Sequence, residues 1–281
     1  MLGIFRTCTM ALSTVALGTV ALAIVIAGVS PVAAADDGDV KKLRDTGQCA
    51  DCDLNEADLQ NADLKGANLA KANLRDADLK GANLTGSNLA RANLSRSDLE
   101  KADLSGADLS RAMMSGVDLE KAVMRGTKMH RVDLRDAELD KAVLEGADLS
   151  EGDLRGTSFK RAKLKGSRFE GGKLSHTNFE RADLQGANLS DTNLKAARLD
   201  RADLTGENLR KANLEKTRMS RAILRGAQLQ EASFKGAIFN KADLSGADLS
   251  DADNLTQAQL DEACGNADTV LPGGMTIPAC E

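Results

Sequence analysis

The sequence predicts an all-β solenoid, because one short pattern is repeated along most of the chain. From residue 54 to residue 249 every fifth residue is Leu, Phe or Met, in forty consecutive repeats without an insertion. A step of five residues turns about 500° around an α-helix, so no helical face would collect these side chains. In a flat strand an odd step would send them to alternate faces. A chain that turns by a constant angle in each repeat buries all of them, which is typical of a solenoid.

A second period predicts how many repeats complete one turn. The residue two positions after the central Leu, Phe or Met is Gly at ten places, from Gly66 to Gly246, spaced by twenty residues. Glycine is typical of corners that need a positive φ angle or a close approach of two backbones. One such corner in twenty residues predicts four repeats per coil, and therefore ten coils over residues 52–251.

The repeat resembles that of the pentapeptide repeat family. Residues 57–59, 62–64 and 67–69 read Ala-Asp-Leu, Ala-Asp-Leu and Ala-Asn-Leu, as in the A(D/N)LXX motif of that family. The resemblance covers 200 of the 281 residues. It implies a right-handed quadrilateral β-helix, with the central residue and the preceding Ala pointing inward. It also implies a family of mostly unknown function, whose best understood members imitate DNA and bind DNA gyrase.

The flanking segments are expected to cover the two ends of the solenoid, which would otherwise be open to pairing with other chains. Residues 36–51 contain Val40 and Leu43 at helical spacing and predict a short helical cap. Residues 252–281 form the second cap, in which the segment that begins at Thr256 fits a capping box. Ten coils spaced by about 4.8 Å predict a rod about 48 Å long between the caps.

Residues 1–35 differ in kind from the rest of the chain. Arg6 precedes a nearly continuous apolar stretch over residues 10–29, and small residues follow it. This order is typical of a secretory signal peptide that is cleaved before Asp36. The apolar stretch is long for a signal peptide, so an uncleaved N-terminal membrane anchor is the alternative. We expect the mature protein to be periplasmic or secreted.

Four cysteines lie in the two caps. Cys49 and Cys52 belong to the N-terminal cap region, and Cys264 and Cys280 to the C-terminal tail. In an oxidising compartment they predict one disulfide in each cap. A zinc site built from all four would require the two ends of the rod to meet. A redox-active Cys-x-x-Cys pair lacks its usual βαβ context here, so no metal and no cofactor is expected.

One corner of the solenoid is predicted to carry a stripe of cations. The stripe consists of Lys101, Lys121, Lys141, Arg161, Arg181, Arg201, Arg221 and Lys241. An acidic row precedes it at Glu100, Glu120, Asp140, Glu180 and Asp200. The stripe is either a solvated corner that these acids neutralise, or a docking surface for an anionic glycan, lipid headgroups or an acidic protein face. Nucleic acid is disfavoured, because the chain has a net charge of −5 and only 2% aromatic residues.

Two further outward columns are candidate surfaces. One column near the stripe is acidic at its start and basic later, in the order Asp58, Asp78, Asp98, Asp118, Glu138, Arg198 and Arg218. The glycine column is the other, since a corner with few side chains would allow another molecule to approach closely. The alternative is that the glycines satisfy a turn requirement copied by duplication of a twenty-residue unit.

The sequence predicts no enzyme. His130 and His176 are the two histidines, and they fall on different faces more than two coils apart. A nucleophile and its base must lie within hydrogen-bond reach of each other. Glu207 is the one charged residue at an inward position, where burial of a charge is costly. We expect this carboxyl either to be protonated or to turn outward.

Three hypotheses for the function follow. The first is a non-catalytic, exported scaffold that presents flat charged faces to a macromolecular partner. The second, implied by the family resemblance, is a DNA-mimicking protein that binds gyrase or another topoisomerase, although gyrase is cytoplasmic and a signal peptide argues against this. The third is a binder of an anionic polymer or lipid surface through the cation stripe. A homodimer is compatible with all three.

Overall fold

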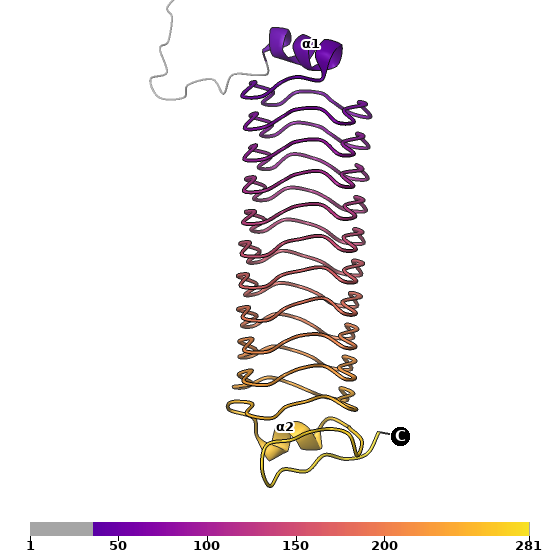
Figure 1. Ribbon diagram of the computed structural model, residues 1–281, viewed down its shortest axis with the longest axis vertical. Coiled ribbons are helices and arrows are strands. Elements are labelled where there is room, and N and C mark those ends of the chain that lie inside the picture. The colour runs from indigo at the N-terminus through magenta and orange to yellow at the C-terminus, as the bar shows by residue number, and fades with distance from the viewer. Residues whose placement is uncertain (1–35, 281) are drawn as a thin grey trace, which may run out of the picture. The chain divides into compact units, whose positions relative to one another are not determined.

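The computed structural model describes residues 36–280, which form a four-sided β-helical rod with one short helix at each end (Figure 1). Helix α1 spans Asp37–Thr46 and helix α2 spans Gln257–Asp261. Between them, within the described residues, the structure has isolated parallel β-bridges in place of longer strands. The signal peptide or anchor expected at residues 1–35 lies outside the described part of the chain.

The register of the rod is set by bridges between residues twenty positions apart. Asp58 pairs with Asp78, for example, and Asp63 pairs with Asn83. Each central residue except Phe239 donates its backbone N–H to a carbonyl in the next coil or in the C-terminal cap, as Leu54 does to Asn73 at 2.7 Å. Four repeats therefore make one coil, as the spacing of the glycines predicts, and residues twenty apart form straight columns along the outer surface.

The four corners of each coil require residues with a positive φ angle. Gly66 has a φ of 67°, and a Cβ atom added there would meet no atom within 4 Å. The conformation of the chain, rather than crowding, thus explains glycine at this corner. The eight residues of the cation stripe adopt the same left-handed conformation, with φ between 55° and 61°. This conformation is disfavoured by about 1–2 kcal/mol for a residue with a Cβ atom.

The interior of the rod is filled by the central side chains and the small residues that precede them. All forty central residues are buried. Three phenylalanines pack together, with Phe159 stacked on Phe179 at a centroid distance of 5.0 Å and Phe169 edge-on to both. Since aromatic pairs in these geometries add to the burial of apolar area, they strengthen the middle of the rod.

Both ends of the core are covered by the flanking segments. Leu43 of α1 is buried, and Gly47, whose φ is 64°, caps the C-terminal end of α1. At the other end Thr256 and Gln259 form a capping box at the start of α2. The side-chain amide of Gln259 also donates to the carbonyls of Phe234 and Ala237, at 2.9 and 2.8 Å. No helix within residues 36–280 is long and apolar enough to cross a membrane.

Candidate functional site

The cation stripe lies on one exposed corner of the rod, with one residue in each of eight successive coils. Its N-terminal half is neutralised by two glutamates. Glu100 forms ion pairs with Lys80, Lys101 and Lys121, and Glu120 forms ion pairs with Lys121 and Lys141. Hydrogen bonds from Lys80 and Lys101 lower the pKa of Glu100 to about 2. Those from Lys141 and Lys121 lower the pKa of Glu120.

The C-terminal half of the stripe has few such partners. Within residues 36–280, no carboxylate oxygen lies within 4.0 Å of the charged groups of Arg161, Arg201, Arg221 or Lys241, and Arg181 makes one contact with Glu180, at 3.9 Å. The acids of this half form ion pairs with arginines of the neighbouring outward column, the one that begins at Asp58. Glu180 pairs with Arg198 at 3.5 Å, and Asp200 with Arg218 at 3.3 Å.

We call the cations of this half, together with the two neighbouring arginines, the basic patch. Its members are Arg161, Arg181, Arg198, Arg201, Arg218, Arg221 and Lys241. Four of its arginines line a shallow hollow of about 280 Å³, together with Glu180, Asp200 and Ser220. The patch therefore combines exposed guanidinium groups with a concave surface, whereas the first three lysines of the stripe are held by acids.

The difference between the two halves follows from the acidic row, which does not act uniformly. The carboxylate of Asp140 is hydrogen-bonded to Ser158 Oγ and to the backbone N–H of Lys160, and it forms no ion pair with Lys141. The row holds Lys160, Ser220 and Asn240 at its positions beside Arg161, Arg221 and Lys241. These three residues, which interrupt the acidic row, are visible in the sequence. They could have indicated that the C-terminal half of the cation stripe lacks neighbouring acids.

The acidic column consists of Asp58, Asp78, Asp98, Asp118 and Glu138. None of these five carboxylates forms an ion pair within the described residues, and none is buried. In the aspartates one oxygen accepts a hydrogen bond from the backbone N–H two residues later, at 2.8 Å in Asp98 and Asp118. The second oxygen of Asp78 also accepts a long hydrogen bond from the side-chain amide of Gln60, at 3.4 Å.

The histidines do not form a catalytic site of the Ser-His-Asp type. His130 Nδ1 lies 3.0 Å from Ser150 Oγ, and the hydroxyl of Ser150 donates to Asp148 at 2.6 Å. Burial raises the pKa of Asp148, but the hydrogen bonds from Ser150 outweigh it and leave this pKa below its ordinary value. The serine proton is therefore directed to the carboxylate and away from the imidazole, which is the reverse of nucleophile activation. His176 lines a hollow at another corner, with Arg135 and Arg155.

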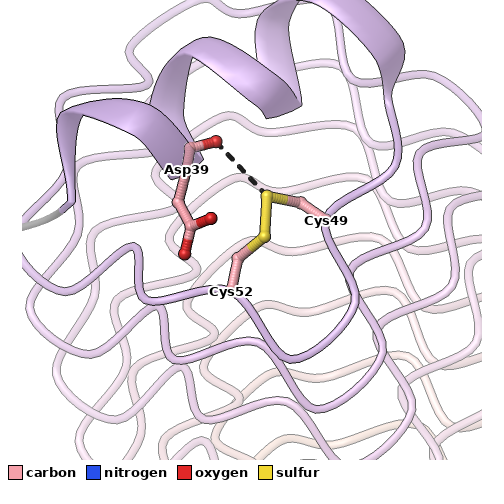
Figure 2. Close-up of side chains that lie close together, drawn as sticks. All are labelled: Asp39, Cys49 and Cys52. Carbon is pink, nitrogen blue, oxygen red and sulfur yellow. Dashed lines mark hydrogen bonds between the residues drawn. A yellow bond between two sulfur atoms is a disulfide. The ribbon is translucent and has the colours of Figure 1, made fainter.

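The cap cysteines are paired as the sequence predicts, in disulfides Cys49–Cys52 and Cys264–Cys280. Figure 2 shows the first disulfide beneath α1, beside Asp39. The carbonyl oxygen of Asp39 lies 3.3 Å from Cys49 Sγ, and its carboxylate accepts a hydrogen bond from the backbone of Asp53 at 2.8 Å. While the sulfur atoms are joined to each other they offer no thiolate to a metal ion or to thiol exchange.

Glu207 points into the core. Of the two outcomes expected from the sequence, the structure therefore excludes the outward turn of this side chain. Its side chain is fully buried, and within residues 36–280 neither carboxyl oxygen has a hydrogen-bond partner. The nearby amides of Ala187 and Leu189 already donate to the carbonyls of Leu184 and Asn208. Burial raises the pKa of Glu207 well above its usual value, so the fold favours the protonated form of this carboxyl.

A model of pentapeptide repeats matches the chain in eight copies over segments between residues 48 and 264. The chain belongs to the pentapeptide repeat family. Members of this family are generally structural or binding proteins rather than enzymes, and their solved structures imply a right-handed quadrilateral β-helix for this chain as well.

Solved structures of this family resemble the rod to different degrees. HetL, a pentapeptide repeat protein involved in heterocyst differentiation regulation in the cyanobacterium Nostoc, is 34% identical, with a TM-score of 0.73; the match covers 75% of this chain and 96% of HetL. The plasmid-mediated fluoroquinolone resistance protein QnrB1 is 20% identical, with a TM-score of 0.44, and the match covers 66% of this chain and 89% of QnrB1. A comparison with curated protein sequences found no match.

Proposed function

We propose that the protein is a non-catalytic, exported scaffold of ten four-sided coils between two helical caps, and that it binds an acidic protein through its basic patch. The observation that carries the proposal is the division of the stripe into a neutralised half and a half without close ion pairs among residues 36–280. Cations stacked at about 4.8 Å repel one another. An anionic partner would relieve this repulsion and would be steered by the positive potential.

The composition of the patch favours a protein over a uniformly anionic polymer. Six of its seven cations are arginines, whose planar guanidinium groups bind carboxylates through two hydrogen bonds. Glu180 and Asp200 lie among these arginines and line the same hollow. These two carboxylates would repel a uniformly anionic glycan or lipid surface. A protein face, in contrast, can place its own cations next to them.

The test compares crosslinking pull-downs from a native periplasmic extract. One variant replaces Arg161, Arg201, Arg221 and Lys241 by Gln, and its matched control replaces Lys101, Lys121 and Lys141 by Gln. The first variant should lose the partner and the control should keep it, while both keep the circular dichroism spectrum of the wild type. A partner that the first variant retains would show that the patch is not the docking surface.

The anionic-polymer hypothesis is tested with defined probes. Retention on heparin and binding to phosphatidylglycerol vesicles are measured for the wild type and the same two variants, over a range of salt concentrations. We expect weak binding that is equal in all three proteins. Strong retention that only the patch variant loses would favour the polymer or lipid surface over an acidic protein.

The proposal of export is supported by the apolar segment within residues 1–35 and by the two disulfides, since disulfides persist in oxidising compartments. The gyrase-binding alternative is favoured by one observation, the acidic column, whose carboxylates stack without ion pairs. Cell fractionation with N-terminal sequencing separates the two. A mature chain that begins at Asp36 in the periplasm or medium supports export, and a chain found only in the cytoplasm overturns it.

A further inference from the structure

The last coil of the rod is paired with the C-terminal cap on three of its four sides. Parallel bridges join Ser233, Asp243 and Asp248 to Asp253, Cys264 and Val270. Ile238 holds the equivalent place on the fourth side. It pairs with Arg218 in the preceding coil, but with no residue beyond it in the described part of the chain. This side of the last coil therefore ends in an open β-edge, where the chain forms α2 instead of a further bridge.

The open edge leaves a backbone donor without an acceptor. The N–H of Phe239 makes no hydrogen bond within residues 36–280, whereas the equivalent N–H of Met219 donates to the carbonyl of Ile238 at 2.8 Å. The neighbouring carbonyl of Ala237 is satisfied, because it accepts from the side-chain amide of Gln259 at 2.8 Å. Backbone N–H groups of buried residues rarely lack a partner. The edge thus offers a donor to a molecule that brings an acceptor.

A hollow of about 300 Å³ lies between this edge and α2. Its lining includes Ala237, Ile238 and Phe239 from the last coil and Ala258 from α2, and Glu262 adds a carboxylate. The ring of Phe239 is buried in the core, with its centroid 5.3 Å from that of Phe234, so this residue reaches the hollow with its backbone. We call this space the apolar hollow, and the unpaired N–H of Phe239 belongs to its wall.

The apolar hollow lies one coil beyond the arginines of the basic patch. Ile238 is bridged to Arg218, which lines the hollow between the arginines. In the outward column that begins at Asp58, every residue before Ile238 is polar or charged. Ile238 is nevertheless 48% exposed. The rod therefore presents an apolar contact directly beside guanidinium groups, on one side and in successive coils.

We propose that the acidic partner binds through an extended segment, with one apolar side chain in the apolar hollow and neighbouring carboxylates on the basic patch. The proposal rests on the proposed function and names the kind of segment that the patch takes. A backbone carbonyl of the segment accepts from the N–H of Phe239, as a carbonyl of the next coil does for the other central residues. Coils are about 4.8 Å apart and an extended chain rises about 3.3 Å per residue. Acidic residues within about three positions of the apolar one therefore lie beside the arginines of the two preceding coils.

The surroundings of the apolar hollow favour a protein segment over a lipid. Glu262 lines this hollow, and Glu180 and Asp200 line the one between the arginines. These carboxylates oppose an anionic membrane surface, but they permit a segment whose own carboxylates point towards Arg218. The volume is at the lower limit of the range of about 300–1,000 Å³ for ligand pockets, which suits one side chain better than an acyl chain.

The first experiment uses two peptides with blocked ends, Asp-Glu-Asp-Leu-Asp-Glu-Asp and the same peptide with Ser in place of Leu. Chemical shifts of the backbone amides are followed in the isotope-labelled protein, expressed as the whole chain, while each peptide is added up to millimolar concentration. We expect saturable shifts at Phe239 and Asn240 with the leucine peptide. The serine peptide should bind about five- to tenfold more weakly, because a half-exposed apolar contact is lost. Equal binding of the two peptides, or no shift at Phe239, overturns the proposal.

A variant and a matched control locate the contact. Ile238→Asn introduces the residue type of Asn178 in the same column, whose side chain accepts from the backbone N–H of Glu180 at 3.1 Å, so the coil tolerates it. Met113→Asn removes an apolar side chain of similar exposure, 47%, from another column, where it pairs with Asn93. Ile238→Asn should bind the leucine peptide as weakly as the wild type binds the serine peptide, and Met113→Asn should bind it normally. Equal binding by the two variants would contradict the proposal.

Failure of this proposal can be told apart from failure of the proposed function. The variant with Gln at the positions of Arg161, Arg201, Arg221 and Lys241 should bind both peptides more weakly than the wild type, because the carboxylates lose their partners. If this variant weakens both peptides and Ile238→Asn weakens neither, the patch binds acidic segments and only the apolar hollow is wrong. If this variant binds both peptides as the wild type does, both proposals are overturned.

Two other occupants of the apolar hollow give different results. Decanoate, added as a probe with an anionic head and an acyl chain, should bind more weakly than the leucine peptide. Tighter binding of decanoate would assign the hollow to a lipid. Shifts at Phe239 that depend on protein concentration in the absence of peptide would assign the hollow to a second copy of the chain. Either result would overturn the proposal.

Discussion

Replacement of the buried Glu207 by Ala is expected to stabilise the protein. Ala occupies the equivalent position in the coils before and after, at Ala187 and Ala227, so it is compatible with this corner of the core. The carboxyl is buried without a hydrogen-bond partner among residues 36–280, and such a group costs about 1–3 kcal/mol. The bond from the Asn208 amide to the Ala187 carbonyl is also long, at 3.4 Å, against 2.8 Å from the Gln228 amide to the Glu207 carbonyl.

The expected gain of about 1–3 kcal/mol corresponds to a rise in Tm of about 2–12 °C for a chain of this size. The gain should depend on pH, because burial raises the pKa of Glu207 in the folded state. Below the ordinary pKa of about 4.3 the carboxyl is protonated in both states. As pH rises from that value toward the raised pKa of the folded state, the unfolded chain ionises before the folded chain does, so wild-type stability falls by at most about 1.36 kcal/mol per pH unit.

The assay is thermal and guanidinium unfolding of the wild type, Glu207→Ala and Glu207→Gln between about pH 4 and about pH 8, followed by circular dichroism. The advantage of both variants over the wild type should grow with pH. Glu215→Gln is the control of opposite sign, since the hydrogen bond from Lys195 lowers the pKa of Glu215, and its wild-type contribution is lost as pH falls. A lower Tm for Glu207→Ala at about pH 7, or an advantage that does not change with pH, would refute the reasoning.

Three further predictions concern the caps and the core. Gln259→Ala should destabilise the C-terminal cap by about 1–3 kcal/mol, because the carbonyls of Phe234 and Ala237 lose their donor; hydrogen exchange should accelerate first in the last coils. Replacement of Cys264 and Cys280 by Ser should lower the free energy of unfolding by about 3 kcal/mol, from the loop that the disulfide closes; denaturant unfolding measures this loss. Phe169→Ala should cost about 3–5 kcal/mol and lower the denaturation midpoint without changing the charge surface.

Much of the fold is encoded in the spacing of residues. The repeat of five and the glycine spacing of twenty predict the pairing of Asp58 with Asp78, because a constant turn places equivalent residues in one column. The capping box at Thr256 and Gln259 is also readable, since its contacts are local in sequence. The second role of Gln259, as a donor to carbonyls of the final coils, depends on how the helix sits on the rod and has no sequence signal.

The charged site was less predictable than the fold. The columns can be written down from the sequence, but the ion pairs depend on which rotamer each long side chain adopts. Glu100 forms ion pairs with three lysines, whereas Asp140 accepts a hydrogen bond from Ser158. Both acids lie in the same row, so column position alone does not separate them. The inward orientation of Glu207 likewise follows from the backbone of its coil rather than from its residue type.

The pairing of each coil with the one twenty residues later restricts how the gene for such a protein can change length. Gain or loss of a whole coil leaves every remaining column intact, so the rod can lengthen or shorten in steps of twenty codons. Gain or loss of a single pentapeptide would preserve the hydrophobic lining but rotate everything downstream by one side. An acidic first half and a basic second half would then end up on different sides of the rod. Selection on surface charge can therefore purge small in-frame insertions that stability alone would tolerate.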